Sequence, residues 1–250
     1  MIRAENALKT FGQQQVLKGI SFTFESGKTN LIIGRSGAGK TVLLKILVGL
    51  QVPTSGIVWY DKVNFTGLDK KGMREIRMKI GMLFQGSALF DSLTVEQNIR
   101  FPLDMFTNMS KEEKLDRVNF CLQRVKLEGK NQLYPAELSG GMKKRAALAR
   151  AIANNPGYLF CDEPNSGLDP KTSIVIDELI RDITVEYNIT TIIITHDMNS
   201  VMEIGDNIMF VYKGKNWWKG TSKLVLDSDN AELKDFVFAS EFMKSFLRKK

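Results

Sequence analysis

The sequence predicts an α/β fold with a mainly parallel sheet at its core. Short apolar runs alternate with helix-length segments along the chain, which is typical of parallel strands covered on both faces. A glycine-rich loop also joins one of these runs to a helix-length segment. The length of 250 residues suits one such domain or two small ones.

Composition excludes several classes of protein. With 43% hydrophobic and 25% charged residues, the chain is neither disordered nor collagen-like. The net charge of +7 suits nucleotide phosphates, nucleic acid or an anionic membrane, and it does not choose among them. Two cysteines, Cys121 and Cys161, argue against a disulfide framework or zinc site and for a reducing compartment. The N-terminus lacks a secretion-signal pattern, and no apolar run approaches the roughly 18 residues of a membrane span, so we expect a soluble cytoplasmic protein.

Each predicted strand is apolar throughout, which indicates that both of its faces are buried. These strands are residues 30–33, 80–84, 158–161 and 190–195. Residues 207–220 differ, because two short strands flank Lys213-Gly214-Lys215 and predict an antiparallel hairpin. Trp217 and Trp218 are adjacent on this hairpin and should face opposite sides, with one of them exposed.

The pattern between residues 85 and 138 is helical. Thr94 with Gln97, and Ser110 with Glu113, each form a capping-box pattern at a helix start. We therefore predict a helical region inserted into the sheet-containing core. A further helical tail is predicted at the C-terminus, with phenylalanines at helical spacing and a basic end: Phe238, Phe242, Phe246, Arg248, Lys249 and Lys250. We expect this tail to pack on its own domain, with contact to a second copy as the alternative.

A phosphate-binding loop is predicted at residues 34–41, GRSGAGKT, between a strand and a helix expected to span residues 41–50. Its glycines permit positive φ angles, and the helix N-terminus adds partial positive charge. Lys40 should reach the β- and γ-phosphates of a nucleotide, and the Thr41 hydroxyl should ligate Mg²⁺. The predicted nucleotide contacts are Gly34, Arg35, Ser36, Gly37, Ala38, Gly39, Lys40, Thr41 and Val42.

Two carboxylates follow the predicted strand at residues 158–161. Asp162 is placed to hold Mg²⁺ through water, and Glu163 to orient and deprotonate an attacking water. Such a pair after a strand is often only a solvated turn, but together with a phosphate loop it favours a functional site. A phosphate loop alone leaves kinases, GTPases and helicases open.

Residues 138–142, LSGGM, resemble the signature motif of ATP-binding cassette (ABC) ATPases. Other motifs of that family occur in the same order: Phe11 where the family stacks an aromatic on adenine, Gln85 as in the Q-loop, residues 166–169 (SGLD) as in the D-loop, and His196 as the switch histidine. The resemblance covers essentially residues 1–220. It implies the ABC fold: a parallel core with an N-terminal antiparallel β part and an inserted helical subdomain.

The resemblance also implies a division of the chain and a set of roles. The ATP-binding core would be residues 1–85 and 155–220, the helical subdomain residues 86–154, and the C-terminal helical extension residues 221–250. The catalytic residues would be Lys40, Gln85, Glu163 and His196, and the Mg²⁺ ligands Thr41, Gln85 and Asp162.

In the family, the signature motif binds ATP that is held by a second subunit. Two copies of this chain would therefore sandwich two ATP molecules, with Ser139, Gly140, Gly141 and Asp169 contacting the partner's nucleotide. The signature should open a helix that runs to about residue 153. The three cations that follow, Lys143, Lys144 and Arg145, are interpreted most simply as the solvated face of this helix, with contacts to another subunit as the alternative.

Met142 stands where the family usually has glutamine, and in this it resembles the Mce-associated, Mla-type group, which energises lipid transport across the bacterial envelope. Residues 82–95 and 98–103 are also similar to that group. The apolar patch Leu89, Phe90 and Phe101 would receive a short helix of a membrane subunit, or would instead pin the helical region to the core.

The implied function is the ATPase subunit of a lipid transporter, most simply a phospholipid transporter, on the inner face of the cell membrane. Its partners would be a separate permease, an Mce-domain lipid-binding protein and a small regulatory subunit. Two alternatives are a soluble ABC ATPase acting on nucleic acid or ribosomes and an ABC transporter ATPase for another substrate. Nucleic acid is less favoured because the chain lacks a basic block interleaved with aromatics. A kinase conflicts with the signature and with Glu163.

Overall fold

The computed structural model describes residues 1–238 and divides the chain into two compact units. The first comprises Met1–Glu25, Thr29–Gly67 and Ile194–Lys250, and the second Ser26–Lys28 and Leu68–Ile193. The predicted boundaries at residues 85/86, 154/155 and 220/221 stay a prediction.

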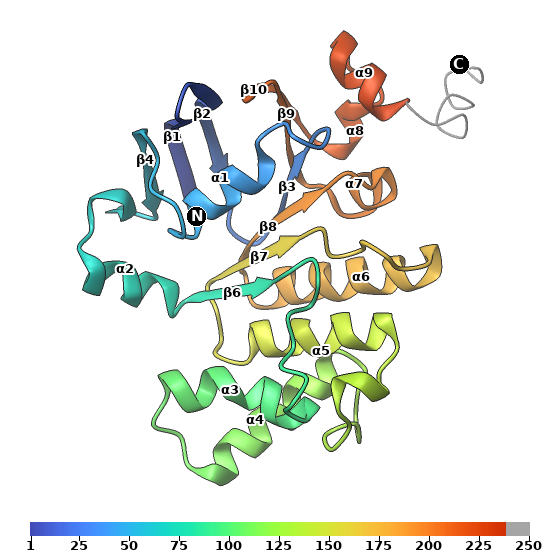
Figure 1. Cartoon of the computed structure of the whole chain (residues 1–250). Coiled ribbons are helices and arrows are strands. Elements are labelled where there is room, and N and C mark those ends of the chain that lie inside the picture. The colour runs from blue at the N-terminus through green and yellow to red at the C-terminus, as the bar shows by residue number, and fades with distance from the viewer. Residues whose placement is uncertain (239–250) are drawn as a thin grey trace. The chain divides into compact units, whose positions relative to one another are not determined.

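The first unit combines an antiparallel sheet of order β2-β1-β4-β5 with strands β3 and β9, which pair in parallel, and β10, which pairs antiparallel to β9. Helix α1 packs on β1 and β2 (Figure 1). The elements of this unit are β1 (Ile2–Phe11), β2 (Gln14–Phe24), β3 (Thr29–Ile33), α1 (Lys40–Leu47), β4 (Ser55–Tyr60), β5 (Val63–Asn64), α7 (Met198–Ile204), β9 (Asn207–Tyr212), β10 (Lys215–Gly220), α8 (Ser222–Val225) and α9 (Ala231–Val237).

The second unit contains the parallel pair β6 and β7 and a group of helices in which α5 contacts α3, α4 and α6 (Figure 1). Strand β8 (Thr190–Thr195) leads from this unit into the first. The other elements are α2 (Lys70–Arg77), β6 (Ile80–Leu83), α3 (Val95–Phe106), α4 (Lys111–Arg124), α5 (Gly140–Ile152), β7 (Tyr158–Asp162) and α6 (Pro170–Glu186). Short 3₁₀ helices lie at Phe65–Gly67 and Pro135–Glu137.

The predicted α/β fold class is confirmed, with its parallel strands, antiparallel β part and helical region. Both capping boxes are also present, with the Thr94 and Ser110 hydroxyls accepting from the amides of Gln97 and Glu113. Helix α1 is shorter than expected: it ends at Leu47 rather than residue 50, because Gly49 adopts a left-handed φ of 72°.

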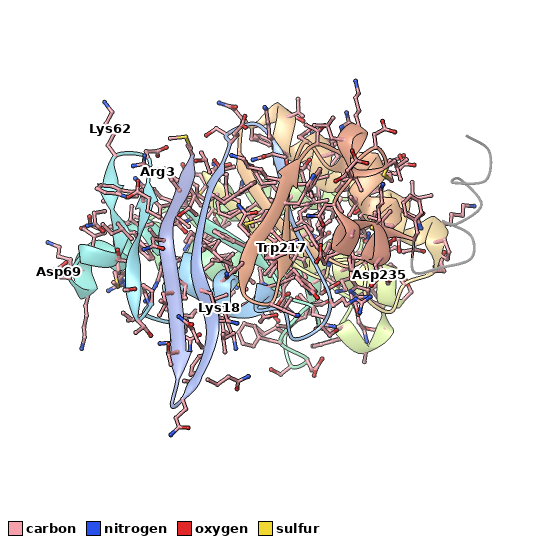
Figure 2. The ribbon with its side chains drawn as sticks, turned by 90° about the horizontal axis from the view of Figure 1, so that it is seen from above. Arg3, Lys18, Lys62, Asp69, Trp217 and Asp235 are labelled. Atoms are coloured by element: carbon pink, nitrogen blue, oxygen red, sulfur yellow. The ribbon has the colours of Figure 1, made fainter. Side chains whose placement is uncertain are left out.

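The hairpin and the start of the C-terminal tail agree with their predictions. Figure 2 shows Trp217 on β10, where it is exposed, while Trp218 is half-buried. Helix α9 packs on its own unit: Leu233 is fully buried, and the ring of Phe236 lies 5.4 Å from that of Phe210. Phe242, Phe246, Arg248, Lys249 and Lys250 lie outside the described residues.

Both cysteines are free, buried thiols. Burial raises the pKa of the Cys121 thiol to about 11, so that it stays neutral. Within residues 1–238, no helix is both long and apolar enough to cross a bilayer.

Asn98 fixes the loop between β6 and α3. Its side chain is fully buried and pairs with the backbone, its oxygen accepting from the amide of Phe90 at 2.8 Å. Its amide nitrogen donates to the carbonyls of Phe90, Leu93 and Thr94 at 3.0–3.1 Å. One side chain thus satisfies several backbone groups that have left water.

We predict that Asn98→Ala lowers the free energy of unfolding by about 1–3 kcal/mol, because it leaves buried backbone groups without partners. Urea unfolding measures the change. The control is Asn108→Ala, whose side chain is exposed and whose effect should stay within about 0.5 kcal/mol. Equal stability of the two variants would contradict this account.

Candidate active site

The phosphate loop lies in the first unit, between β3 and α1, and its glycines are required by its backbone. Gly34, Gly37 and Gly39 have φ angles of 147°, 77° and 105°, which other residues rarely adopt. A Cβ at Gly34 would also collide with the carbonyl oxygen of Val211. The glycines of the GRSGAGKT motif are therefore required by the backbone conformation of the loop.

Lys40 is nearly buried, and the loop folds around its ammonium group. Its Nζ donates to the carbonyl oxygens of Gly34 at 2.7 Å and Arg35 at 3.2 Å. Thr41 is exposed on the first turn of α1, where the helix amides and dipole favour an anion. An ammonium group, a hydroxyl and helix amides are thus gathered at one end of α1.

The remaining residues of the loop contribute mainly through the backbone. The carbonyl of Arg35 also accepts from the amide of Ala38 at 3.2 Å. The guanidinium of Arg35 makes an exposed ion pair with Asp235 of α9 at 2.6 Å. Ser36 is exposed and Val42 half-buried.

Two further predicted residues belong to the first unit. Phe11 ends β1 with 43% of its surface exposed, and the Lys9 ammonium lies 5.1 Å from its ring centroid. An exposed ring beside a cation can stack on a base and face its phosphates. His196 is exposed directly after the fully buried strand β8.

In the second unit, Gln85 follows β6, while Asp162 ends β7 and Glu163 follows it. These two strands are parallel neighbours, so their polar residues emerge at the same edge. The side-chain amide of Gln85 donates to the Ser166 hydroxyl at 3.2 Å, which joins the predicted Q-loop to the predicted D-loop. Glu163 itself has a left-handed φ of 48°.

The interpretation of residues 143–145 as a solvated face is wrong for Lys144 and Arg145. Lys144 is buried, and its Nζ donates to the carbonyl oxygens of Gln85 and Glu163. Burial lowers the pKa of Lys144, and the nearby carboxylates of Asp162 and Glu163 oppose this shift.

Arg145 is half-buried. Its guanidinium donates to the carbonyls of Val125 at 3.2 Å and Lys126 at 2.7 Å, and burial lowers its pKa. The helical spacing of the sequence indicates that Lys144 is buried, since it shares a helix face with the apolar residues Leu148 and Ala151 at i+4 and i+7. The run of three neighbouring cations suggests an exposed face instead, and this is why the prediction failed.

The signature motif opens α5 as predicted. Ser139 is the N-cap, and its hydroxyl accepts from the Met142 amide at 3.3 Å. Gly140 is exposed at the helix start, and Gly141 lies where a Cβ would come within 2.5 Å of the Thr172 methyl group.

Asp169 has a structural role that the sequence analysis missed. Its carboxylate caps α6 by accepting from the Thr172 hydroxyl at 2.5 Å and the Thr172 amide at 3.0 Å. These two hydrogen bonds, the hydroxyl's first, lower the pKa of Asp169.

The predicted site residues therefore fall into two sets, each within one unit. Phe11, the phosphate loop and His196 belong to the first, and Gln85, the signature, Asp162, Glu163 and Asp169 to the second. Among residues 1–238, no cluster of three or more His, Cys, Asp and Glu side chains could hold a metal alone. The hydroxyl of Thr41 and the carboxylate of Asp162 are hard oxygen donors that suit Mg²⁺ carried with nucleotide phosphates.

The chain matches the family model described as ABC transporter over residues 17–166. It is 39% identical to the methionine import ATP-binding protein MetN of Latilactobacillus sakei, over 96% of this chain and 71% of that protein. It is 35% identical to the probable ribonucleotide transport ATP-binding protein mkl of Mycobacterium leprae, over 94% of this chain and 68% of that one.

A solved dimeric ATP-binding cassette, in a post-hydrolysis state with ADP and Pi, superposes with a TM-score of 0.81 at 33% identity. The match covers 89% of this chain and 99% of that one. By contrast, the chain spans 64% of several other methionine import proteins, including one from Bacillus anthracis.

We predict that Lys40→Ala weakens ATP binding about 10- to 100-fold, because one charge-assisted hydrogen bond to phosphate is lost. Titration calorimetry with the ATP–Mg²⁺ complex measures the dissociation constant. The matched control is Lys45→Ala, an exposed lysine of the same helix, which should bind like the unaltered chain. Tight binding retained by Lys40→Ala would count against this account of the loop.

Proposed function

The chain belongs to the ABC transporter family and is an ATPase of that family; from this premise we propose that it energises transport through a separate membrane-embedded permease. Two observations carry the proposal: the first unit holds a phosphate loop built around Lys40, and in the second unit the carboxylates Asp162 and Glu163 lie at the end of β7. The names of the relatives support transport as its purpose.

Each predicted site residue has a role in the proposed hydrolysis of ATP. Lys40 and the phosphate loop bind the phosphates of ATP, Phe11 stacks on adenine, and Glu163 takes a proton from the attacking water. Mg²⁺, held by Thr41, Asp162 and Gln85, would neutralise developing charge on the phosphate oxygens. His196 contacts the γ-phosphate.

A second copy of the chain completes each site in this proposal. Ser139, Gly140, Gly141 and Asp169 would contact ATP held by the partner, so that ATP bridges the two copies until hydrolysis removes the bridge. The solved dimer of a related cassette supports this arrangement. The exposed start of α5 also suits it, because helix N-termini favour anions.

The permease would dock in an apolar groove of about 430 Å³ within the second unit. Phe90 and Phe101 line it as a pair with centroids 4.9 Å apart, and both rings are exposed, as expected for a binding surface. Arg77 and Arg150 also line it and would favour the acidic side chains or C-terminus of a short permease helix. In this proposal the chain lies on the inner face of the membrane.

For the transported molecule we propose a lipid, most simply a phospholipid, with an Mce-domain protein and a small regulatory subunit as further partners. Met142 and residues 82–103 support this through their likeness to the Mla-type group. Methionine is the second candidate, favoured by the MetN relatives. The ATPase itself touches neither molecule in this scheme.

The experiment that separates these substrates is purification of tagged Glu163→Gln from its native cells with ATP in mild detergent. Mass spectrometry of a permease with an Mce-domain protein and phospholipid would support the lipid proposal. A permease with a methionine-binding protein would replace lipid by methionine. Ribosomal proteins or nucleic acid without a permease would overturn the transport proposal.

We predict that Glu163→Gln slows ATP hydrolysis by about 10²–10⁴-fold, the usual contribution of a general base, while ATP binding is retained. Phosphate release under single-turnover conditions measures the rate. Glu128→Gln, at an exposed position, is the matched control and should hydrolyse at the unaltered rate. Near-normal turnover by Glu163→Gln would show that Glu163 is not the general base.

A further inference from the structure

Lys144 is a buried lysine in the middle of the second unit. Only 4% of its surface is exposed, although it lies on α5 in a run of three cations. Removing an ammonium group from water is costly unless oxygen atoms replace the water. The ammonium group of Lys144 therefore needs oxygen atoms of the protein in place of water.

The compensating oxygens come from two segments that are far apart in the sequence. The Lys144 Nζ donates to the carbonyl of Gln85, which follows β6, and to that of Glu163, which follows β7, at 3.5 Å. One ammonium group on the signature helix therefore joins the ends of two parallel strands.

The bond to Glu163 falls at a strained point of the backbone. Glu163 has a φ of 48°, a left-handed conformation that is strained for residues other than glycine. Its carbonyl oxygen accepts from the amide of Ser166 at 3.1 Å as well as from Lys144. These bonds stabilise the turn that directs the Glu163 side chain.

The Gln85 segment is held from both sides. Its carbonyl accepts from Lys144, and its side-chain amide donates to the Ser166 hydroxyl at 3.2 Å. Farther along α5, Arg150 donates to the carbonyls of Ser87 and Ala88 at 2.9 and 2.8 Å. Cations of α5 thus hold the loop that leads from Gln85 toward the groove.

We propose that Lys144 is a positioning residue for ATP hydrolysis, which holds the backbone of Glu163 and of Gln85 in register with the signature helix. The inference rests on the proposed role of Glu163 as the base. Lys144 acts through Glu163 and makes no contact with the substrate in this scheme. Its loss should therefore lower turnover rather than ATP binding.

The test compares Lys144→Met, which keeps the length of the side chain but removes its charge, with Lys144→Arg, which restores a donor. We expect Lys144→Met to lower kcat about 10- to 100-fold with KM for ATP changed less than threefold, and Lys144→Arg to recover at least a third of the lost activity. Lys143→Met is the matched control at the neighbouring, half-buried position and should keep its kcat. If Lys144→Met does not fold, Lys144→Gln carries the same expectation.

A double-mutant comparison separates this inference from the role of Glu163. In the Glu163→Gln background, Lys144→Met should lower kcat by a smaller factor than it does in the unaltered chain, because no base is left to position and only the hold on Gln85 is lost. The inference would be overturned if Lys144→Met lowered kcat in the Glu163→Gln background by as large a factor as in the unaltered chain. It would also be overturned if folded Lys144→Met alone kept a kcat within threefold of normal, or if a raised KM accounted for its whole loss of activity. Near-normal turnover by Glu163→Gln alone would instead overturn the assigned base.

Discussion

Each unit of this protein is organised around a lysine ammonium group that has left water. An ammonium group without water needs oxygen acceptors, and in both units backbone carbonyls supply them. In the first unit, the loop from Gly34 curls so that its carbonyls meet Lys40. In the second, the residues that follow β6 and β7 bring their carbonyls to Lys144. The glycines, the left-handed Glu163 and the Gln85 segment all follow from this requirement.

Much of the fold and site could be predicted because the signals are local. The phosphate loop, the buried strands at residues 30–33, 158–161 and 190–195, and both capping boxes depend on residues within a few positions of one another. The strand predicted at residues 80–84 is only half-buried, with Ile80 and Met82 partly exposed. The burial of Lys144 depends on carbonyls 59 and 19 residues away, which no local pattern contains. The capping role of Asp169 is also a local signal, because Asp169 precedes Pro170 and Thr172 at the start of a helix.

The chemistry of the chain and its biological purpose rest on different parts of the molecule. In our proposal, phosphate binding and hydrolysis depend on the residues around β3, α1, β6 and β7. The groove around Phe90 and Phe101 would select the permease, and the permease would select the transported molecule. Relatives at 39% and 35% identity carry the names of different transport systems.

ATP is the proposed link between two copies of the chain, and sedimentation of Glu163→Gln tests that proposal most directly. Without nucleotide, we expect a species of the 28.2 kDa chain mass. Addition of ATP with Mg²⁺ should produce a species of twice that mass, and the same addition should leave Lys40→Ala combined with Glu163→Gln unchanged. A Glu163→Gln chain that binds ATP to saturation and still sediments as a single copy would contradict the account.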